Sequence, residues 1–361
     1  MKHLLVDITA HGYGHIAQTA PVVNELVHRL PDLRVTVRSA ATTAYLQQRF
    51  TIPFQHIPLA IDFGMTMFDA VAVDVPRSLA NYREYHADWG GKVAQAAHEM
   101  RELQPDILFA NVPYKSLAAA KVAGIPAVSM CCLNWADIYR HYAPDDTESR
   151  AIHGQMLAAY DSAEIFLKVS PTMPMESLSR GRTIAPIAQV GVEQRSSALS
   201  RCGGQVGDKL VLVAMGGINY SLPMEKWPRI AGVRWLVPQA WNIQRDDTSA
   251  LEAMGMSFSD LLASCDAVLT KPGYGMFAEA VYVGVPIIYV SRGAWPEQPY
   301  LVEWLQQNGV GIEVGQEALE QGAMQSVLDV AFSAGRKPAM VGSGVHEAAD
   351  TLQSMMMRTT K

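Results

Sequence analysis

Residues 271–280 read Lys-Pro-Gly-Tyr-Gly-Met-Phe-Ala-Glu-Ala and directly follow the apolar run Ala267 to Thr270. The run predicts a buried strand, and the residues after it predict a short helix that ends before Gly284 and Pro286. Two glycines at a strand-to-helix turn let the backbone approach a ligand closely. The free N–H groups at the start of the helix attract an anion such as a pyrophosphate.

Two further features point to a ligand at this turn. Glu279 lies four residues beyond Gly275, about one helical turn, where its carboxylate can accept hydrogen bonds from both hydroxyls of a ribose. After the next strand, the loop from Arg292 to Tyr300 holds Glu297 and Gln298 side by side, which together offer acceptors and donors to the hydroxyls of a sugar. The alternative is an ordinary tight turn with a solvated glutamate.

Working outward, short apolar runs alternate with helical patterns through both halves of the chain. This alternation predicts βαβ units, parallel sheets and the α/β class. The expected strands are Leu4 to Ile8, Val35 to Arg38, Ile107 to Ala110, Ala127 to Cys131, Ile165 to Val169, Leu210 to Ala214, Trp235 to Pro238, Ala267 to Thr270 and Pro286 to Val290.

The length of 361 residues favours two domains, because single hydrophobic cores usually stop growing below that size. We expect a first Rossmann-like domain over 1–192 and a Ser/Gly-rich linker over 193–208. A second Rossmann-like domain over 209–345 and a C-terminal helix over 346–361, candidate to pack back on the first domain, complete the prediction.

Composition restricts the function classes. A net charge of -6 with 49% apolar residues is typical of a globular protein and makes nucleic acid an improbable partner. No apolar run reaches the roughly 20 residues that cross a bilayer, and the first residues do not form a secretory signal. Four cysteines without zinc spacing indicate neither a disulfide framework nor a metal site, which favours the cytoplasm.

The turn after the first strand carries two histidines, His11 and His15, in the stretch Ala10 to Ala17. An imidazole at such a turn can take a proton from a hydroxyl near neutral pH. We expect the helix that starts near His15 to lower the pKa of its imidazole and keep the ring neutral. His15 is the first candidate base and His11 the second; the alternative is that His15 only bonds the turn.

The stretch from Ser264 to Leu301 resembles the donor-binding core of GT-B glycosyltransferases, and it covers about a tenth of the chain. The resemblance implies two Rossmann-like doubly wound parallel-sheet domains that face a central cleft. It also implies that Glu279 binds the nucleotide ribose, that the turn with Lys271, Gly273, Tyr274 and Gly275 holds the diphosphate, and that Glu297 with Gln298 contacts the donor sugar. Glu297 stands where aspartate is more usual.

Two weaker correspondences extend the same resemblance. Gly216 and Gly217 follow the first strand of the second half and are similar to the glycine turn that completes the phosphate cradle. An ordinary turn between a strand and a helix explains them nearly as well. By position, Phe258 lies where the nucleobase is expected.

In the first half, the Gly-His-Ile turn at His15 resembles glycosyltransferases that make macrolide, plant-metabolite and lipid-linked glycosides. In several of those families the matching histidine is the general base, oriented by an aspartate after the fourth strand. This chain has Asn111 at that place, and an amide cannot stabilise an imidazolium as a carboxylate does.

The resemblance therefore implies a metal-independent, hexosyltransferase-like enzyme without a resident cofactor. It would move a sugar from a nucleotide-diphosphate donor, expected to be a UDP-sugar, to a hydroxyl of a small-molecule or lipid-like acceptor. Alternatives are a sugar-nucleotide sensor or epimerase of the same fold. A third is an NADP-dependent oxidoreductase that uses Gly12-x-Gly14 and Arg38. A homodimer remains open.

Overall fold

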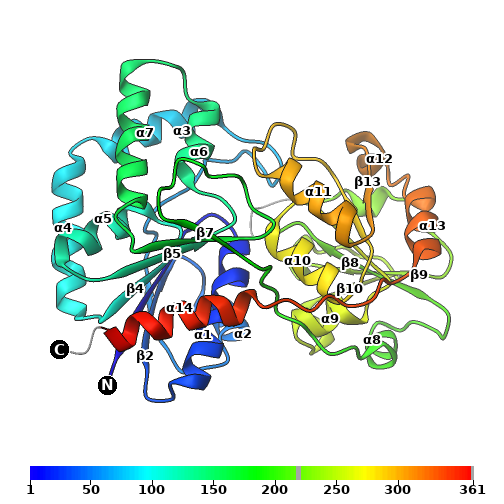
Figure 1. Cartoon of the computed structure of the whole chain (residues 1–361). Coiled ribbons are helices and arrows are strands. Elements are labelled where there is room, and N and C mark those ends of the chain that lie inside the picture. Colours follow the sequence, from blue (N-terminus) through cyan, green and yellow to red (C-terminus); the bar gives the residue numbers. More distant parts are fainter. Residues whose placement is uncertain (217–220, 359–361) are drawn as a thin grey trace. The chain divides into compact units, whose positions relative to one another are not determined.

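The computed structural model describes residues 1–216 and 221–358 and divides the chain into two compact units (Figure 1). The first unit consists of residues 1–68, 73–187 and the C-terminal segment from residue 342. The second consists of residues 69–72 and 188–341. Each unit is built on its own parallel sheet, of seven and six strands respectively, which confirms the predicted α/β class.

The sheet of the first unit is wholly parallel and has the order β3-β2-β1-β4-β5-β6-β7. The five central strands are those that the sequence predicts, and they are nearly all buried. The strands are β1 (His3–Ile8), β2 (Arg34–Ser39), β3 (Gln55–Pro58), β4 (Ile107–Asn111), β5 (Ala127–Cys131), β6 (Ile165–Val169) and β7 (Gly181–Ile184).

The strand order of the first sheet reverses direction between β1 and β4. Because crossovers between parallel strands are right-handed, the reversal places the helices of the two halves on opposite faces. One group of helices is α1 (Gly14–Arg29), α2 (Thr43–Arg49) and α14 (Gly344–Arg358). The other group is α3 (Val75–His86), α4 (Trp89–Leu103), α5 (Tyr114–Ala123), α6 (Trp135–Tyr142) and α7 (Thr147–Tyr160).

The second sheet repeats this plan with the order β10-β9-β8-β11-β12-β13, which reverses between β8 and β11. Its strands are β8 (Lys209–Ala214), β9 (Val233–Val237), β10 (Thr248–Ala250), β11 (Ala267–Thr270), β12 (Ile287–Tyr289) and β13 (Gly311–Glu313). The helices are α8 (Arg195–Arg201), α9 (Phe258–Ser264), α10 (Tyr274–Tyr282), α11 (Gln298–Asn308), α12 (Gln316–Gln321) and α13 (Gln325–Ala334). A buried cluster that includes Trp235, Leu269 and Leu328 fills the space between the sheet and α13.

The segment that leads from the first unit into the second differs in its bounds from the linker that the sequence predicts. The change from the first unit to the second falls between residues 187 and 188, whereas the linker was expected over 193–208. That stretch contains α8, which the ion pair between Arg195 and Asp266 (2.5 Å) ties to the second unit.

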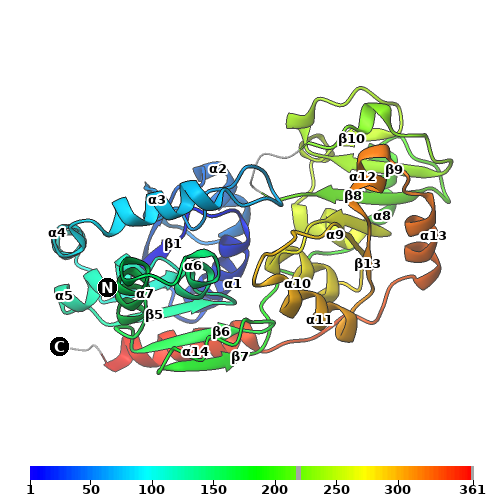
Figure 2. The ribbon, with the colours of Figure 1, turned by 90° about the horizontal axis from the view of Figure 1, so that it is seen from above.

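The C-terminal helix α14 packs against α1 and β7 of the first unit, as both views of the ribbon show (Figure 2). Its apolar face buries Ala349, Leu352 and Met356. On the polar side, Arg29 of α1 pairs with Asp350, and His346 Nδ1 lies 3.2 Å from Glu25 Oε1. Over the described residues, none of the helices has both the length and the apolar character that a bilayer crossing requires.

Candidate functional site

The candidate catalytic residues lie at the point where the first sheet reverses direction. In open parallel sheets, ligands bind beyond the carboxyl ends of the strands at this switch point. Ile8, the last residue of β1, is in register with Asn111, the last residue of β4. The turn after β1 leads into α1, so the sequence brings His15 in the first turn of α1 next to the end of β4.

His15 and Asn111 are in direct contact, with 2.9 Å between His15 Nδ1 and Asn111 Oδ1. Asn111 is fully buried and His15 is 6% exposed. The amide nitrogen of Asn111 donates to Gln18 Oε1 at 3.2 Å, so its oxygen faces the histidine. An amide oxygen can only accept a hydrogen bond, and therefore Nδ1 of His15 carries the proton and Nε2 keeps its lone pair.

A cysteine that the sequence analysis did not connect with this site completes the surroundings of His15. Cys131, at the end of β5, places its sulfur 3.6 Å from His15 Nδ1. The neighbouring thiol of Cys132 lies 4.0 Å from Cys131 Sγ and accepts a hydrogen bond from Gln18 Nε2 at 3.0 Å. The two cysteines, Gln18, Asn111 and His15 thus form one buried polar network, which we call the His15 network.

The expectation that the start of α1 lowers the pKa of His15 is wrong. Burial does lower this pKa, but the negative charge of Cys131 and hydrogen bonds to Cys131 and Asn111 outweigh burial, and the pKa of His15 is raised. For the Cys131 thiol, whose charged form is negative, burial has the opposite effect and raises the pKa. Hydrogen bonds from Cys132 and the positive charge of His15 reverse that effect and lower it to about 6.

The second candidate, His11, lies on the same turn but outside the His15 network. Its ring meets the Trp135 ring edge-on, with 5.0 Å between the centroids. Trp135 Nε1 donates to Thr9 Oγ1 at 3.3 Å, and Thr9 in turn donates to Asp62. Asp62 also accepts from the backbone N–H of Ala10 at 3.1 Å, and within the described structure its second oxygen has no hydrogen-bond partner.

The second unit has its own switch point, between β8 and β11, and the predicted glycine turns lie there. Thr270 at the end of β11 is in register with Ala214 at the end of β8. Gly216 has φ +85°, a conformation that favours glycine, and a β-carbon built on it would lie 3.7 Å from Lys271 Nζ. The loop after β8 and the loop after β11 are therefore neighbours. Gly217 lies outside the described residues.

Lys271 and Arg292 place two cationic groups near this turn. Arg292 is 6% exposed, its Nη1 lies 3.5 Å from the carbonyl oxygen of Pro272, and its guanidinium lies 4.0 Å from the centroid of the Trp295 ring. Burial and the nearby charge of Arg292 lower the pKa of the Lys271 ammonium to about 7. Two cations held together in this way favour a bound polyanion.

Glu297 and Gln298 belong to the same loop, but their side chains bond within it. Glu297 accepts a hydrogen bond from Trp295 Nε1 at 3.0 Å. Gln298 accepts from the backbone N–H of Arg292 at 2.6 Å and donates to Ser291 Oγ at 2.8 Å. In this structure the pair shapes the loop after β12.

The remaining predicted residues lie on two helices of the second unit. Gly273 precedes α10, and a β-carbon built on it would meet only the Lys271 carbonyl oxygen within 4 Å, at 3.8 Å, so side chains do not fill the start of α10. Tyr274 and Gly275 form the first turn of α10 and are buried, and Glu279 farther along is 2% exposed. Phe258 is the first residue of α9 and is half-buried.

The residue that the oxidoreductase alternative needs is engaged elsewhere. Arg38, expected to receive the 2′-phosphate of NADP, forms a double hydrogen bond with the buried Asp7, at 2.7 and 2.6 Å. A buried arginine that already binds a carboxylate with both ends of its fork is not available to a phosphate. This arrangement argues against NADP at the Gly12-x-Gly14 turn.

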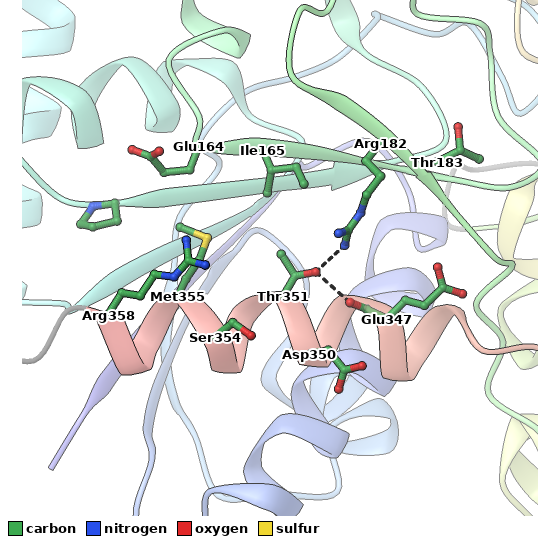
Figure 3. Close-up of a pocket in the computed structure, with 11 residues that line it drawn as sticks. Glu164, Ile165, Arg182, Thr183, Glu347, Asp350, Thr351, Ser354, Met355 and Arg358 are labelled. Carbon is green, nitrogen blue, oxygen red and sulfur yellow. Dashed lines mark hydrogen bonds between the residues drawn. The ribbon is translucent and has the colours of Figure 1, made fainter.

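A cavity of about 810 Å³ occurs in the first unit between α14 and the strands β6 and β7 (Figure 3). Arg182 and Thr351 meet across it, with a hydrogen bond of 2.6 Å from the guanidinium to the hydroxyl. None of the candidate catalytic or nucleotide-binding residues lines this cavity.

Sequence reasoning missed Cys131, Gln18 and Arg292 as parts of the two sites. The sequence signal for Arg292 was its place in the loop after a predicted strand. Cys131 likewise ends a predicted strand, but a cysteine at a strand end does not by itself indicate a partner for a histidine. Gln18 gives no signal, because it is one polar residue inside a helical pattern.

Comparison with known proteins places the fold. No family model matches the chain. Among curated proteins, the chain is 24% identical to L-arabinokinase from Arabidopsis thaliana over 359 residues, a match that covers 98% of this chain. The chain spans about a third of the length of that relative, with 34% of it covered.

Solved structures resemble the chain over its whole length. The calicheamicin glycosyltransferase CalG4 is 15% identical, with 99% of this chain and 95% of that chain covered and a TM-score of 0.57. A UDP-N-acetylglucosamine 2-epimerase is 16% identical, with coverage of 99% and 98% and a TM-score of 0.55. A transferase from Siraitia grosvenorii in complex with UDP is 14% identical, with coverage of 99% and 100% and a TM-score of 0.53. The chain has the GT-B fold, as the sequence resemblance implied.

Proposed function

We propose that the protein is a metal-independent glycosyltransferase that moves a sugar from a nucleotide-diphosphate donor to a hydroxyl of a small-molecule or lipid-like acceptor. The second unit would bind the donor, with UDP as the expected nucleotide, and the first unit would bind the acceptor. Free cysteines at positions 131, 132, 202 and 265 are in keeping with the reducing cytoplasm as its compartment.

The observation that carries the proposal is the pair Lys271 and Arg292 beside two glycine-containing turns at one switch point. The start of α10 supplies backbone N–H groups, and the two cations supply the positive charge that a diphosphate requires. During transfer, the bond between the anomeric carbon and the diphosphate breaks, and its electron pair leaves with the diphosphate. Cations and N–H groups at that place stabilise the departing charge.

His15 is the proposed base. Its Nδ1 carries a proton and is held by Asn111, so Nε2 is the nitrogen with a free electron pair. Nε2 would accept the proton of the acceptor hydroxyl while the oxygen attacks the anomeric carbon. His11, whose ring packs edge-on against Trp135, is the weaker candidate for the same task.

A screen over nucleotide sugars tests the proposal. A ligand that binds only the native protein raises its melting temperature. At a ligand concentration of 100 times Kd, the free energy of unfolding increases by about 2.7 kcal/mol. The set should contain UDP-glucose and UDP-N-acetylglucosamine, and also UDP-L-arabinose, because the curated relative is named for L-arabinose. Donors that stabilise the protein are then tested for release of UDP with and without alcohol acceptors. Absence of any stabilising donor would contradict the proposal.

An epimerase of the same fold is the second candidate. Asp62 favours it, since a buried carboxylate with one unpartnered oxygen next to the His15 turn is a group that acid–base chemistry on a sugar nucleotide can use. The two candidates differ in product. An epimerase forms a second sugar nucleotide, or a free epimeric sugar, without an acceptor, and takes up solvent deuterium at a ring carbon, whereas a transferase does neither.

A further inference from the structure

We propose that Cys131 acts as a thiolate and is the counter-ion of His15, in the place that a carboxylate occupies in other histidine-base enzymes. The inference rests on the proposed function of His15 as base and adds the group that makes this base effective. Cys131 is a positioning residue. Its side chain is fully buried, so it cannot contact a substrate, whereas His15 keeps a small exposed fraction of 6%.

The first argument is position. Cys131 ends β5 and Asn111 ends β4, and these strands are neighbours in the sheet, so both side chains approach His15 from the same sheet edge. The distance from Cys131 Sγ to His15 Nδ1 is 3.6 Å, which is within hydrogen-bond range for sulfur. The N–H at Nδ1 thus has two acceptors, Asn111 Oδ1 and Cys131 Sγ, and only the sulfur can carry a negative charge.

The second argument is the direction of the hydrogen bonds in the His15 network. Asn111 donates to Gln18, and Gln18 donates to Cys132. The sulfur of Cys132 lies 4.0 Å from Cys131 Sγ, so its thiol can donate to Cys131. The Nδ1 proton of His15 has Asn111 Oδ1 at 2.9 Å and Cys131 Sγ at 3.6 Å from its nitrogen, so the two acceptors can share it. Cys132 and His15 can therefore both donate to the sulfur of Cys131, and such donors stabilise a buried thiolate.

The proposed step balances as follows. Before reaction, Cys131 is a thiolate and His15 is neutral with its proton on Nδ1. The acceptor O–H bond breaks, its proton forms a bond to Nε2 of His15, and the oxygen attacks the anomeric carbon as the diphosphate leaves. His15 becomes an imidazolium, and its new charge is neutralised by Cys131, because Asn111 has no charge to offer.

The charges that face His15 support this assignment. Cys131 makes the largest contribution that raises the pKa of His15, ahead of Asn111 and the more distant Asp62. Burial raises the pKa of the Asp62 carboxyl itself, which weakens its negative charge. Of the other side chains around the ring, Trp135 on α6 is neutral and His11 makes its ring contact with Trp135.

The charge of Cys131 is measured directly, without an activity assay. Thiolates absorb near 240 nm and thiols do not, so the difference spectrum between the wild type and Cys131→Ser at pH 7.5 reports the state of this sulfur. We expect the absorbance of one thiolate, and its loss in His15→Ala at the same pH, because the hydrogen bond from His15 that lowers the pKa of the thiol is gone. Cys202→Ser, at a buried thiol of the second unit, is the matched control and should change nothing.

The effect on His15 is measured by NMR of labelled imidazoles across pH. In Cys131→Ser the pKa of His15 should fall, since burial remains and the negative charge is lost, and the rise of kcat/KM with pH should move to lower pH. Loss of the counter-ion should reduce kcat by roughly tenfold or more, and Cys131→Asp should restore part of it. A structural role alone would leave the pKa of His15 unchanged.

The outcomes separate the two proposals. A protonated Cys131 at pH 7.5, or a His15 with its proton on Nε2 in the free protein, overturns this inference even if the protein transfers sugar. A thiolate paired with His15 in a protein that binds and transfers no sugar nucleotide supports the pairing and rejects the proposed function. If Cys131→Ser does not fold, the spectrum of the wild type compared with His15→Ala still decides the charge of Cys131.

Discussion

At the scale of single residues, the proposed role of His15 as the base is tested by replacing it. His15→Ala should lower kcat by about 10²- to 10⁴-fold, the usual contribution of a general base, while donor affinity stays near that of the wild type. His11→Ala, on the same turn, should have a much smaller effect, since the ring of His11 packs on Trp135. Steady-state kinetics and calorimetry measure both. Equal losses in the two variants would remove His15 from its role.

If the nucleotide binds at Lys271 as proposed, its affinity should depend on pH. The Lys271 pKa of about 7 in the free protein means that much of this side chain is neutral at pH 8. A bound diphosphate favours the charged form and raises this pKa, so binding at pH 8 should take up a proton, and affinity should fall as pH rises above 7. Calorimetry in buffers of different ionisation enthalpy measures the uptake. Lys271→Met should abolish it, and an unchanged uptake would assign the proton to another group.

Sequence reasoning at this scale found the residues whose type already indicates chemistry. His15 and Asn111 were both singled out, and the structure brings them into contact at 2.9 Å. The pKa of His15 was predicted in the wrong direction, because its sign depends on Cys131, which lies 116 positions away in the chain. The start of a helix next to His15 can be inferred from the local sequence. The charge of Cys131 on β5 cannot, because only the folded sheet brings it next to His15.

At the scale of elements, the sequence predicts every central strand and none of the edge strands. The strands that were missed, β3, β7, β10 and β13, are the outermost strands of the two sheets. They have three or four residues each and are largely exposed or half-buried. An edge strand lacks the continuous apolar run that marks a strand buried on both faces, so its pattern is too weak to recognise.

The helix α14 contributes to the stability of the first unit. Leu352 lies on the buried face of α14. Leu352→Ala should therefore lower the free energy of unfolding by about 2–5 kcal/mol, through lost burial and the cavity left behind. Met357 on the same helix is 62% exposed, and Met357→Ala should change the free energy little. Denaturant titration followed by circular dichroism compares the two. Similar values for both variants would show that α14 is not part of the core.

At the scale of the whole molecule, two compact units with separate sheets predict two unfolding transitions. If the nucleotide binds to the second unit as proposed, a UDP-sugar should raise the temperature of one transition and leave the other unchanged. Scanning calorimetry measures both, and Lys271→Met serves as the control in which neither transition moves. One transition that shifts as a whole would show that the two units unfold together.

Apart from residues 69–72, the second unit is inserted into the first, because the chain leaves the first unit at residue 187 and returns to it at residue 342. The first unit therefore cannot be produced as one uninterrupted fragment, and residues 1–187 alone would lack α14. A protease that cuts one of the two crossings nicks the protein without releasing either half. Any domain or tag joined to either terminus is attached to the first unit.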